Sequence, residues 1–223
     1  MVVVPGVLFG DDGPPDRDEV LRQGFLRDLA RCKELLPDAR MWPGELDATG
    51  GEDGAKQRVD RRALFGIAER VVACNDEWGP AQLHAAIAVW GAPPGIAMRR
   101  TVRPFDDPNA VKHFADALAV VRGEGPISAY RALSRGSRLW IRDLGPSYFT
   151  KFLYFGGFGA KRYMSQPLIM DDNVVKALGM VTGERWEASL QDYGRYLDLA
   201  ADWASELDTE ADVIEWRLFQ LGS

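Results

Sequence analysis

The stretch LGPSYFTKFLYF, residues 144–155, is typical of a tight turn that opens into a strongly apolar helix. Gly145 suits the turn, and Pro146 suits the first helical position, where a missing N–H leaves no hydrogen bond unmade. The start of such a helix presents unpaired N–H groups and the positive end of the helix dipole, which together favour a phosphate oxygen. The stretch therefore predicts a buried helix whose first turn holds a phosphate.

Composition places the chain among ordinary globular proteins. It has 223 residues, of which 46% are hydrophobic and 27% charged, enough for one sizeable core. No apolar run approaches the roughly 20 residues that a membrane helix needs, and the first residues lack a basic leader. We expect a cytoplasmic protein without a membrane partner, and a monomer. The Gly- and acid-rich segment 42–57 is expected to be a flexible surface loop.

Cysteine and histidine are too few for a metal cluster. The chain has two of each, which excludes a four-cysteine site and makes a zinc site unconvincing. Cys32 and Cys74 are expected to be buried thiols, and His84 and His113 ordinary helix residues. We expect no metal.

Charge is unevenly distributed along the chain. The net charge is −6, yet residues 97–166 hold twelve basic and five acidic side chains, a balance of +7. A local basic field can attract a polyanion even on an acidic chain, since distant charges are screened within about 8 Å at physiological salt. Arginines merely solvated on helix faces are the alternative interpretation.

Apolar spacing predicts an all-α protein. Helices are expected over 16–36, around Leu64 to Val72, from Leu83 to Trp90, over 111–121, from Pro126 to about Arg135, and from Pro146. Others follow over 172–179, from Trp186 to Leu207, and after a Thr209 cap. A loop at 97–109, basic and containing proline, is expected to connect two of them. Strand signals are confined to residues 1–4 and to PLIM, residues 167–170.

Two motifs carry a resemblance to a known family. IRDLGP, residues 141–146, matches a helix-hairpin-helix turn, and LIMDDNVVK, residues 168–176, matches an apolar triplet, an aspartate, two variable positions and a valine. The chain resembles the helix-hairpin-helix DNA glycosylases, and most closely their 8-oxoguanine glycosylase-like branch. The resemblance implies a single domain, 1–223, with two lobes and a cleft between them. Its sub-lobes would be 1–110 with 180–223, and 111–179 with the hairpin.

Asp171 is the expected catalytic carboxylate. At the N-cap of the helix that follows, it would accept backbone N–H bonds that fix its orientation. A carboxylate there can stabilise an oxocarbenium-like sugar or activate the attacking nucleophile. A purely structural cap is the alternative.

The chain departs from the family at the Schiff-base lysine of bifunctional members, which stands two residues after the second glycine of the hairpin. Ser147 occupies that place, and Lys151 follows four residues later on the same helix face. Lys151 would either serve as the amine with a shifted geometry or contact DNA as a surface cation. Sequence alone favours the second option, and with it a monofunctional enzyme in which Asp171 directs water.

Further residues are assigned to DNA and to a base pocket. The expected DNA contacts are Arg138, Arg142, Gly145, Ser147, Lys151, Lys161 and Arg162. A flipped base needs an aromatic pocket, for which the candidates are Trp140, Tyr148, Phe149, Tyr154, Trp216 and Phe219. The resemblance also implies a monovalent cation, but no other cofactor, at the hairpin carbonyls near Leu144 and Gly145.

The sequence therefore predicts a DNA glycosylase that hydrolyses the N-glycosidic bond of a damaged or modified base. An oxidised purine is the default substrate, and a modified base of phage DNA, in an antiviral role, is an alternative. Two other functions stay open. One is a non-catalytic module that binds DNA through the hairpin, and the other is a helical domain whose acidic face binds a protein.

Overall fold

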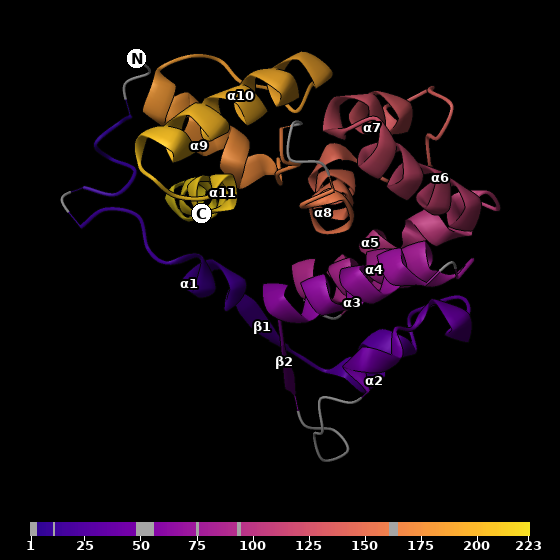
Figure 1. Cartoon of the computed structure of the whole chain (residues 1–223). Coiled ribbons are helices and arrows are strands. Elements are labelled where there is room, and N and C mark those ends of the chain that lie inside the picture. Colours follow the sequence, from indigo (N-terminus) through magenta and orange to yellow (C-terminus); the bar gives the residue numbers. More distant parts are fainter. Residues whose placement is uncertain (1–3, 11, 48–55, 75, 93–94, 161–164) are drawn as a thin grey trace.

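The structure, a computed structural model, describes residues 4–10, 12–47, 56–74, 76–92, 95–160 and 165–223. Over these residues the chain is mostly helical, with one two-stranded sheet (Figure 1). The α-helices are α1 (Arg17–Leu21), α2 (Leu29–Lys33), α3 (Arg61–Ala73), α4 (Gly79–Gly91), α5 (Ile96–Val102), α6 (Ala110–Gly123), α7 (Pro126–Leu133), α8 (Pro146–Gly157), α9 (Asp172–Thr182), α10 (Leu190–Glu206) and α11 (Ala211–Gly222). The strands β1 (Gly24–Arg27) and β2 (Gln57–Asp60) pair antiparallel. In the described part of the chain, no helix is long and apolar enough to cross a membrane.

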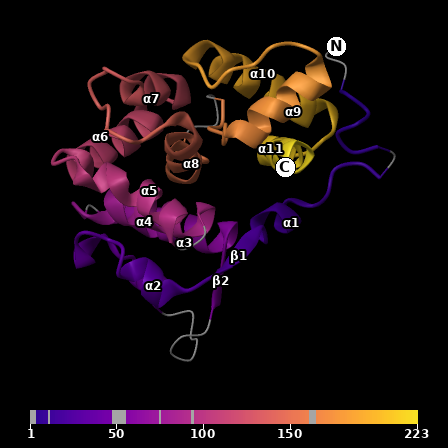
Figure 2. The same cartoon turned by 180° about the vertical axis from the view of Figure 1, so that it is seen from behind.

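Helix α8 lies at the centre of the molecule. It packs against α3, α4, α6 and α7, and both views place it between α7 and the group formed by α9, α10 and α11 (Figures 1 and 2). Its last nine residues, from Phe149 to Gly157, are buried. A Cβ at Gly156 would lie 2.7 Å from Leu118, and one at Gly157 would lie 2.5 Å from Val121. Glycine at these two positions therefore lets α6 approach α8 closely.

Helix α9 is fixed at both ends by its sequence. Asp171 is extended (φ −100°) and caps the first turn, because its carboxylate accepts the Val174 N–H at 3.2 Å. Gly183 ends the helix in the left-handed conformation (φ 71°). The helix packs along α11, which in turn packs against α10 and α1. The predicted Asp171 cap is thus confirmed, and it joins α8 to the C-terminal helices.

A charged network is sealed inside the protein where α1, α3, α8 and α11 meet. Arg61 donates to Glu215 Oε2 at 2.6 Å and to the Tyr154 hydroxyl at 3.3 Å. Tyr154 donates to Asp212 Oδ2 at 2.9 Å, and Arg17 Nε donates to the same oxygen at 2.9 Å. We refer to these five residues as the buried network. Because four of the five are almost fully excluded from water, an ion pair here must be satisfied internally.

The predicted helix over 16–36 is wrong. The chain forms α1, then strand β1, then α2. Gly24 pairs with Asp60, and a Cβ on Gly24 would lie 2.5 Å from the Asp60 side chain. Apolar spacing along one segment does not reveal that a strand 30 residues later pairs with it, so this long-range contact overrides the local pattern.

Other boundary predictions need smaller corrections. The predicted connector 97–109 is largely helical, because it contains α5 and the 3₁₀ turn Arg103–Asp106. The PLIM segment is buried but forms no strand. Helix α11 is preceded by Glu210 rather than by a Thr209 cap. Residues 1–3 and 48–55 lie outside the described residues, so most of the expected N-terminal strand and half of the expected loop 42–57 do too. At the start of that loop Trp42 and Leu46 are buried and Gly44–Leu46 form a 3₁₀ turn, so this part is not the expected surface loop.

One thiol prediction is also wrong. Cys32 is buried as expected, but Cys74 is exposed at the end of α3. His84 and His113 lie on α4 and α6, as predicted. The expected division into sub-lobes stays a prediction.

Candidate functional site

The turn before α8 leaves its first N–H groups open. Gly145 is the N-cap and has no side-chain capping bond, and the N–H groups of Gly145 and Ser147 have no partner among the residues that the structure describes. A Cβ built on Gly145 would meet nothing within 4 Å. The first turn of α8 is therefore open to an approaching anion, as the sequence predicts.

Asp143 gives this turn an unusual backbone. Its φ is +64°, and only one other non-glycine residue in the described part of the chain, Asp208, has a positive φ. The side chain of Asp143 lies 3.8 Å from Arg142 Nε and is about half exposed. An acid therefore occupies a left-handed position that would suit glycine, two residues before the N-cap of α8.

Lys151 and Asp171 form an ion pair at the side of α8. Lys151 Nζ lies 2.8 Å from Asp171 Oδ2, and the two side chains are 9% and 13% exposed. Asp171 Oδ1 meanwhile accepts the cap bond from Val174. Each oxygen of the carboxylate thus has its own partner, so the carboxylate is fixed in orientation as well as in position. The expectation of Lys151 as a cation on the DNA-facing surface does not agree with this burial.

The side chain of Lys151 reaches back along α8 to Ser147, the position where the sequence lacks the expected lysine. Its Nζ also donates to the Ser147 backbone carbonyl at 2.9 Å, because helix side chains lean toward the N-terminus of the helix. The ammonium group therefore reaches back one turn, to the level of Ser147.

The ion pair lines a cavity of about 360 Å³, which we refer to as the lysine pocket. Its lining residues are Gln23, Phe25, Trp90, Gly91, Ser147, Tyr148, Lys151, Asp171, Asp172, Asn173 and Phe219. They come from the loop before β1, from β1, and from α4, α8, α9 and α11. Aromatic rings, two amides and one ion pair in one cavity are the composition expected of a small-molecule or nucleobase site.

Neighbouring residues set the state of two polar groups in the lysine pocket, the Gln23 amide and the Tyr148 hydroxyl. Arg61 Nε donates to Gln23 Oε1 at 2.7 Å, which leaves the Gln23 NH₂ group without a partner among the described residues. The Tyr148 ring lies 5.4 Å from Lys151 Nζ. Burial, with the Asp171 charge as a second cause, raises the pKa of Tyr148 to about 12. Tyr148 therefore stays a neutral hydroxyl at physiological pH.

The predicted aromatic residues separate into three groups. Tyr148 and Phe219 line the lysine pocket. Trp140 and Phe149 line a different cavity on the other side of the hairpin. Tyr154 is fully buried in the buried network, so its assignment to a base pocket is wrong; Trp216 is half-buried and lines neither cavity.

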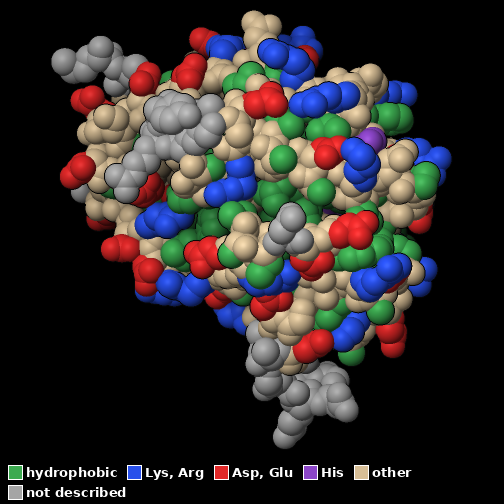
Figure 3. All heavy atoms as spheres, turned by 45° about the vertical axis from the view of Figure 1, so that its right-hand side comes forward, with side chains coloured by type: hydrophobic (Ala, Val, Ile, Leu, Met, Phe, Trp, Pro, Cys, Tyr) green, Lys and Arg blue, Asp and Glu red, His purple; other side chains and the backbone are tan. Residues whose placement is uncertain are grey.

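The predicted DNA contacts are also divided. Arg138 and Arg142 are exposed near the hairpin, whereas Lys161 and Arg162 lie outside the described residues. On the face in Figure 3, Lys and Arg side chains alternate with Asp and Glu rather than forming one continuous basic surface. No cluster of three or more His, Cys, Asp or Glu that could hold a metal is present among the described residues.

Sequence reasoning missed six lining residues: Gln23, Phe25, Trp90, Gly91, Asp172 and Asn173. Gln23 and Phe25 fell within a helix that the structure replaces with a loop and strand β1. Trp90 was assigned to the apolar stripe of its own helix, and it is indeed 3% exposed. Asp172 and Asn173 had a local signal, because they follow Asp171 directly in the first turn of α9.

Comparison with known proteins gives one result. The family model described as "Putative 8-oxoguanine DNA glycosylase OGG-like protein" matches residues 18–219. No curated protein and no solved structure matches the chain. The matched range contains the hairpin turn, the Lys151–Asp171 pair and every lining residue of the lysine pocket.

Proposed function

The chain belongs to the family of OGG-like proteins described as 8-oxoguanine DNA glycosylases, and from this premise we propose that it excises a damaged or modified base from DNA in the lysine pocket. The observation that carries the proposal is the 2.8 Å contact between Lys151 and Asp171 inside an aromatic cavity. A primary amine beside a fixed carboxylate is a suitable arrangement for attack at a sugar carbon.

The DNA strand would be held at the turn before α8. The open N–H groups of Gly145 and Ser147 would bind a phosphate oxygen, with Arg142 and Arg138 nearby. Ser147 belongs to both this turn and the lysine pocket, so a nucleotide next to the bound phosphate has its sugar within reach of Lys151. A monovalent cation between the phosphate and the carbonyls near Leu144 and Gly145 stays part of this proposal.

Chemistry would begin with transfer of a proton from the Lys151 ammonium to Asp171. The freed lone pair on Nζ attacks C1′ of the flipped nucleotide, and the bond from C1′ to the base breaks. The base leaves with the electron pair of that bond and takes up the proton that Asp171 received. The sugar remains attached through a C1′–N bond; Asp171 then carries a proton from this nitrogen to O4′ as the C1′–O4′ bond breaks, which opens the ring and leaves a protonated Schiff base.

This route differs from the hydrolytic enzyme that the sequence favours. In a hydrolytic route Asp171 would activate water, and Lys151 would contact the phosphate backbone. The buried ion pair supports the amine route instead, because Lys151 Nζ already lies against both Asp171 and the Ser147 carbonyl.

The lining of the lysine pocket supports a purine with an exocyclic oxygen. Phe25 and Phe219, both half-buried, offer ring surface for stacking, and the buried Trp90 supports Phe25 from behind at 5.9 Å between ring centroids. The Gln23 NH₂ group, held by Arg61, offers a donor to a carbonyl oxygen on the base. An oxidised guanine meets both requirements, and a modified phage base that keeps a purine carbonyl does as well.

A screen for liberated base tests the proposal. Oligonucleotides carrying single modified bases, and modified phage genomic DNA, would be incubated with wild type and with Asp171→Asn, and free base measured by mass spectrometry. We expect release of an oxidised purine by wild type and a loss of at least about a hundredfold in Asp171→Asn. Equal release by both would remove Asp171 from the chemistry.

The same material distinguishes the two other functions. A non-catalytic DNA-binding module would bind with a steep dependence on salt but release no base. A protein-interaction domain would show no DNA binding that weakens with salt.

A further inference from the structure

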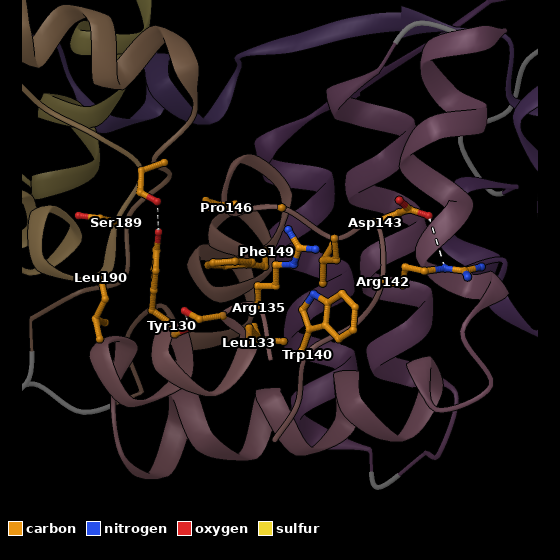
Figure 4. A pocket seen from close by; sticks show the side chains of 14 residues that line it. Tyr130, Leu133, Arg135, Trp140, Arg142, Asp143, Pro146, Phe149, Ser189 and Leu190 are labelled. Carbon is orange, nitrogen blue, oxygen red and sulfur yellow. Dashed lines mark hydrogen bonds and ion pairs between the residues drawn. The ribbon is translucent and has the colours of Figure 1, made fainter. Parts of the chain in front are cut away.

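A second and larger cavity lies against the same hairpin turn. Its volume is about 790 Å³, and we refer to it as the hairpin pocket. Its lining residues are Tyr130, Leu133, Ser134, Arg135, Trp140, Arg142, Asp143, Leu144, Gly145, Pro146, Phe149, Ala188, Ser189 and Leu190. Figure 4 shows Ser189, Leu190 and Tyr130 on one wall, Arg142 and Asp143 on the opposite wall, and Arg135 and Trp140 between them.

The hairpin pocket and the lysine pocket lie on opposite faces of α8. Ser147 and Lys151 line the lysine pocket, whereas Pro146 and Phe149 line the hairpin pocket. At about 100° per residue, these two pairs point in nearly opposite directions from the helix axis. The open N–H groups at the start of α8 lie between the two cavities. A strand bound at that turn therefore has one cavity on each side.

The lining of the hairpin pocket suits a nucleotide. Trp140 is 37% exposed, which is unusual for an indole ring with no functional contact. Arg135 is exposed and has no partner among the residues that the structure describes. Two arginines face one acid here, because Asp143 lies beside Arg142, and the cavity keeps a positive balance. Aromatic rings with arginines are the features by which proteins bind unpaired bases and their phosphates.

We propose that the hairpin pocket holds an unpaired nucleotide of the same strand whose damaged nucleotide occupies the lysine pocket. The base stacks on Trp140, and Arg135 pairs with its phosphate. This inference rests on the proposed function, since the strand is placed by the hairpin turn. The pocket is continuous with that turn through Leu144, Gly145 and Pro146, so the occupant belongs to the bound strand rather than to a separate ligand.

Helix dimensions set the spacing between the two nucleotides. An α-helix is about 10 Å across with its side chains, and a nucleotide in a duplex strand rises about 3.4 Å, so the second site is about three nucleotides from the first. A base that is paired and stacked cannot reach a protein ring. The hairpin pocket therefore favours lesions near a single-stranded segment or a strand end.

Binding to DNA with and without an unpaired extension tests the inference. The probes are duplexes that contain a tetrahydrofuran abasic analogue. One duplex is blunt. In the other two, the strand that carries the analogue continues as a single strand past the end of its complement, which stops about three nucleotides from the analogue on the 3′ side or on the 5′ side. We expect one of the two extensions to lower the Kd of wild type by about tenfold. Trp140→Ala should lose that gain, and Trp140→Phe should keep most of it.

A matched pair of arginines supplies the control. Arg135→Gln should weaken binding of the extended probe, whereas Arg131→Gln should not, because Arg131 is an exposed arginine four residues earlier, on α7, that does not line the hairpin pocket. Equal Kd values of wild type for all three probes, or a gain that persists in Trp140→Ala, would overturn the inference. Trp140-dependent binding of free dGMP without any extension effect would also overturn it, in favour of a separate nucleotide site.

The outcome is separable from that of the proposed function. Base release from the blunt duplex measures the enzyme, while the extension effect measures the hairpin pocket. A protein that releases base but ignores the extension keeps its function and loses this site. A protein that gains affinity from the extension but releases no base keeps the site as a DNA-binding feature.

Discussion

Two ion pairs of this protein are nearly equally short but differ in what surrounds them. Lys151 and Asp171 meet at 2.8 Å on the wall of a cavity, and Arg61 and Glu215 meet at 2.6 Å with 1% and 0% of their side chains exposed. Arg61 also donates to Tyr154 and to Gln23. The first pair has open space beside its amine, while the second is enclosed by protein: Arg61 is bonded to Glu215, Tyr154 and Gln23, and Glu215 Oε1 is buried without a partner among the described residues.

The surroundings of each ion pair determine whether we expect it to contribute to activity or to stability. A buried pair stabilises only when every partner is present, because a lone buried charge has lost its hydration. In a pair beside a cavity, either charged group can leave its partner and contact a substrate instead, so the pair can take part in a reaction. We therefore expect changes in the first pair to remove activity and changes in the second to remove stability.

The largest expected effect is on activity, at Lys151. If Lys151 is the attacking amine, Lys151→Ala should reduce the single-turnover rate of base release by at least about 10⁴-fold. Lys176 supplies the control, because it is an exposed lysine on α9 whose Nζ donates to the Gly222 carbonyl. Lys176→Ala should release base at nearly the wild-type rate. A similar loss in both variants would mean that overall charge rather than the pair is responsible.

The next effect is on stability, at the buried network. Glu215→Ala leaves the Arg61 charge buried without its partner and should lower the free energy of unfolding by about 3–5 kcal/mol. The double variant Arg61→Met with Glu215→Leu removes both charges and should recover most of that loss. Urea unfolding followed by circular dichroism measures both. A Glu215→Ala protein as stable as wild type would contradict a structural role for this pair.

A buried ionisable group without a charged partner extends the comparison. His84 is fully buried, its Nε2 lies 3.2 Å from the Thr101 carbonyl, and its ring stacks on Phe114. Burial lowers the pKa of His84 from 6.5 to about 4. Because the unfolded chain takes up a proton first, stability is complete above pH 6.5 and is lost as the pH falls toward 4.

The histidine should therefore contribute a loss of about 2 kcal/mol in the free energy of unfolding between pH 7 and pH 5. His84→Gln should remove this part of the pH dependence, whatever its effect at pH 7. Urea titrations at the two pH values measure it. The same pH dependence in wild type and variant would show that other groups are responsible.

The smallest expected effect concerns Asp143 and Asp208, the two aspartates in the described part of the chain whose backbone has a positive φ. Replacement of Asp143 or Asp208 by glycine relieves the backbone cost of a positive φ, and each should raise the free energy of unfolding by up to about 1 kcal/mol. Only Asp143→Gly also removes an acid from the predicted phosphate site, and it should lower the Kd for DNA by about fivefold at low salt. Isothermal titration in low and high salt measures the difference. Tighter binding by both variants would point to net charge instead of position.

Local signals account for what could be predicted from the sequence. The proline at the start of α8 and the carboxylate that caps α9 act within one turn, so both elements begin where they were expected. Pairing of β1 with β2 depends on segments more than 30 residues apart. Gln23 and Phe25 enter the lysine pocket through that sheet, so these two lining residues could not be found from spacing alone.

Lys151 shows a second limit of reading by position. Its place in the sequence, four residues after Ser147, argued against a role as the amine. A lysine side chain is long enough to reach back one turn, and the bond to the Ser147 carbonyl shows that it does. Spacing along the sequence therefore does not by itself say where the charged end of a lysine side chain lies.

Borohydride trapping tests the central claim most directly. Wild type would be mixed with DNA that carries the base identified by the screen, reduced with sodium borohydride, digested and analysed by mass spectrometry. We expect a protein–DNA adduct on the peptide that contains Lys151, absent in Lys151→Ala and present in Lys176→Ala. Full release of base with no adduct, or an adduct that persists in Lys151→Ala, would contradict it.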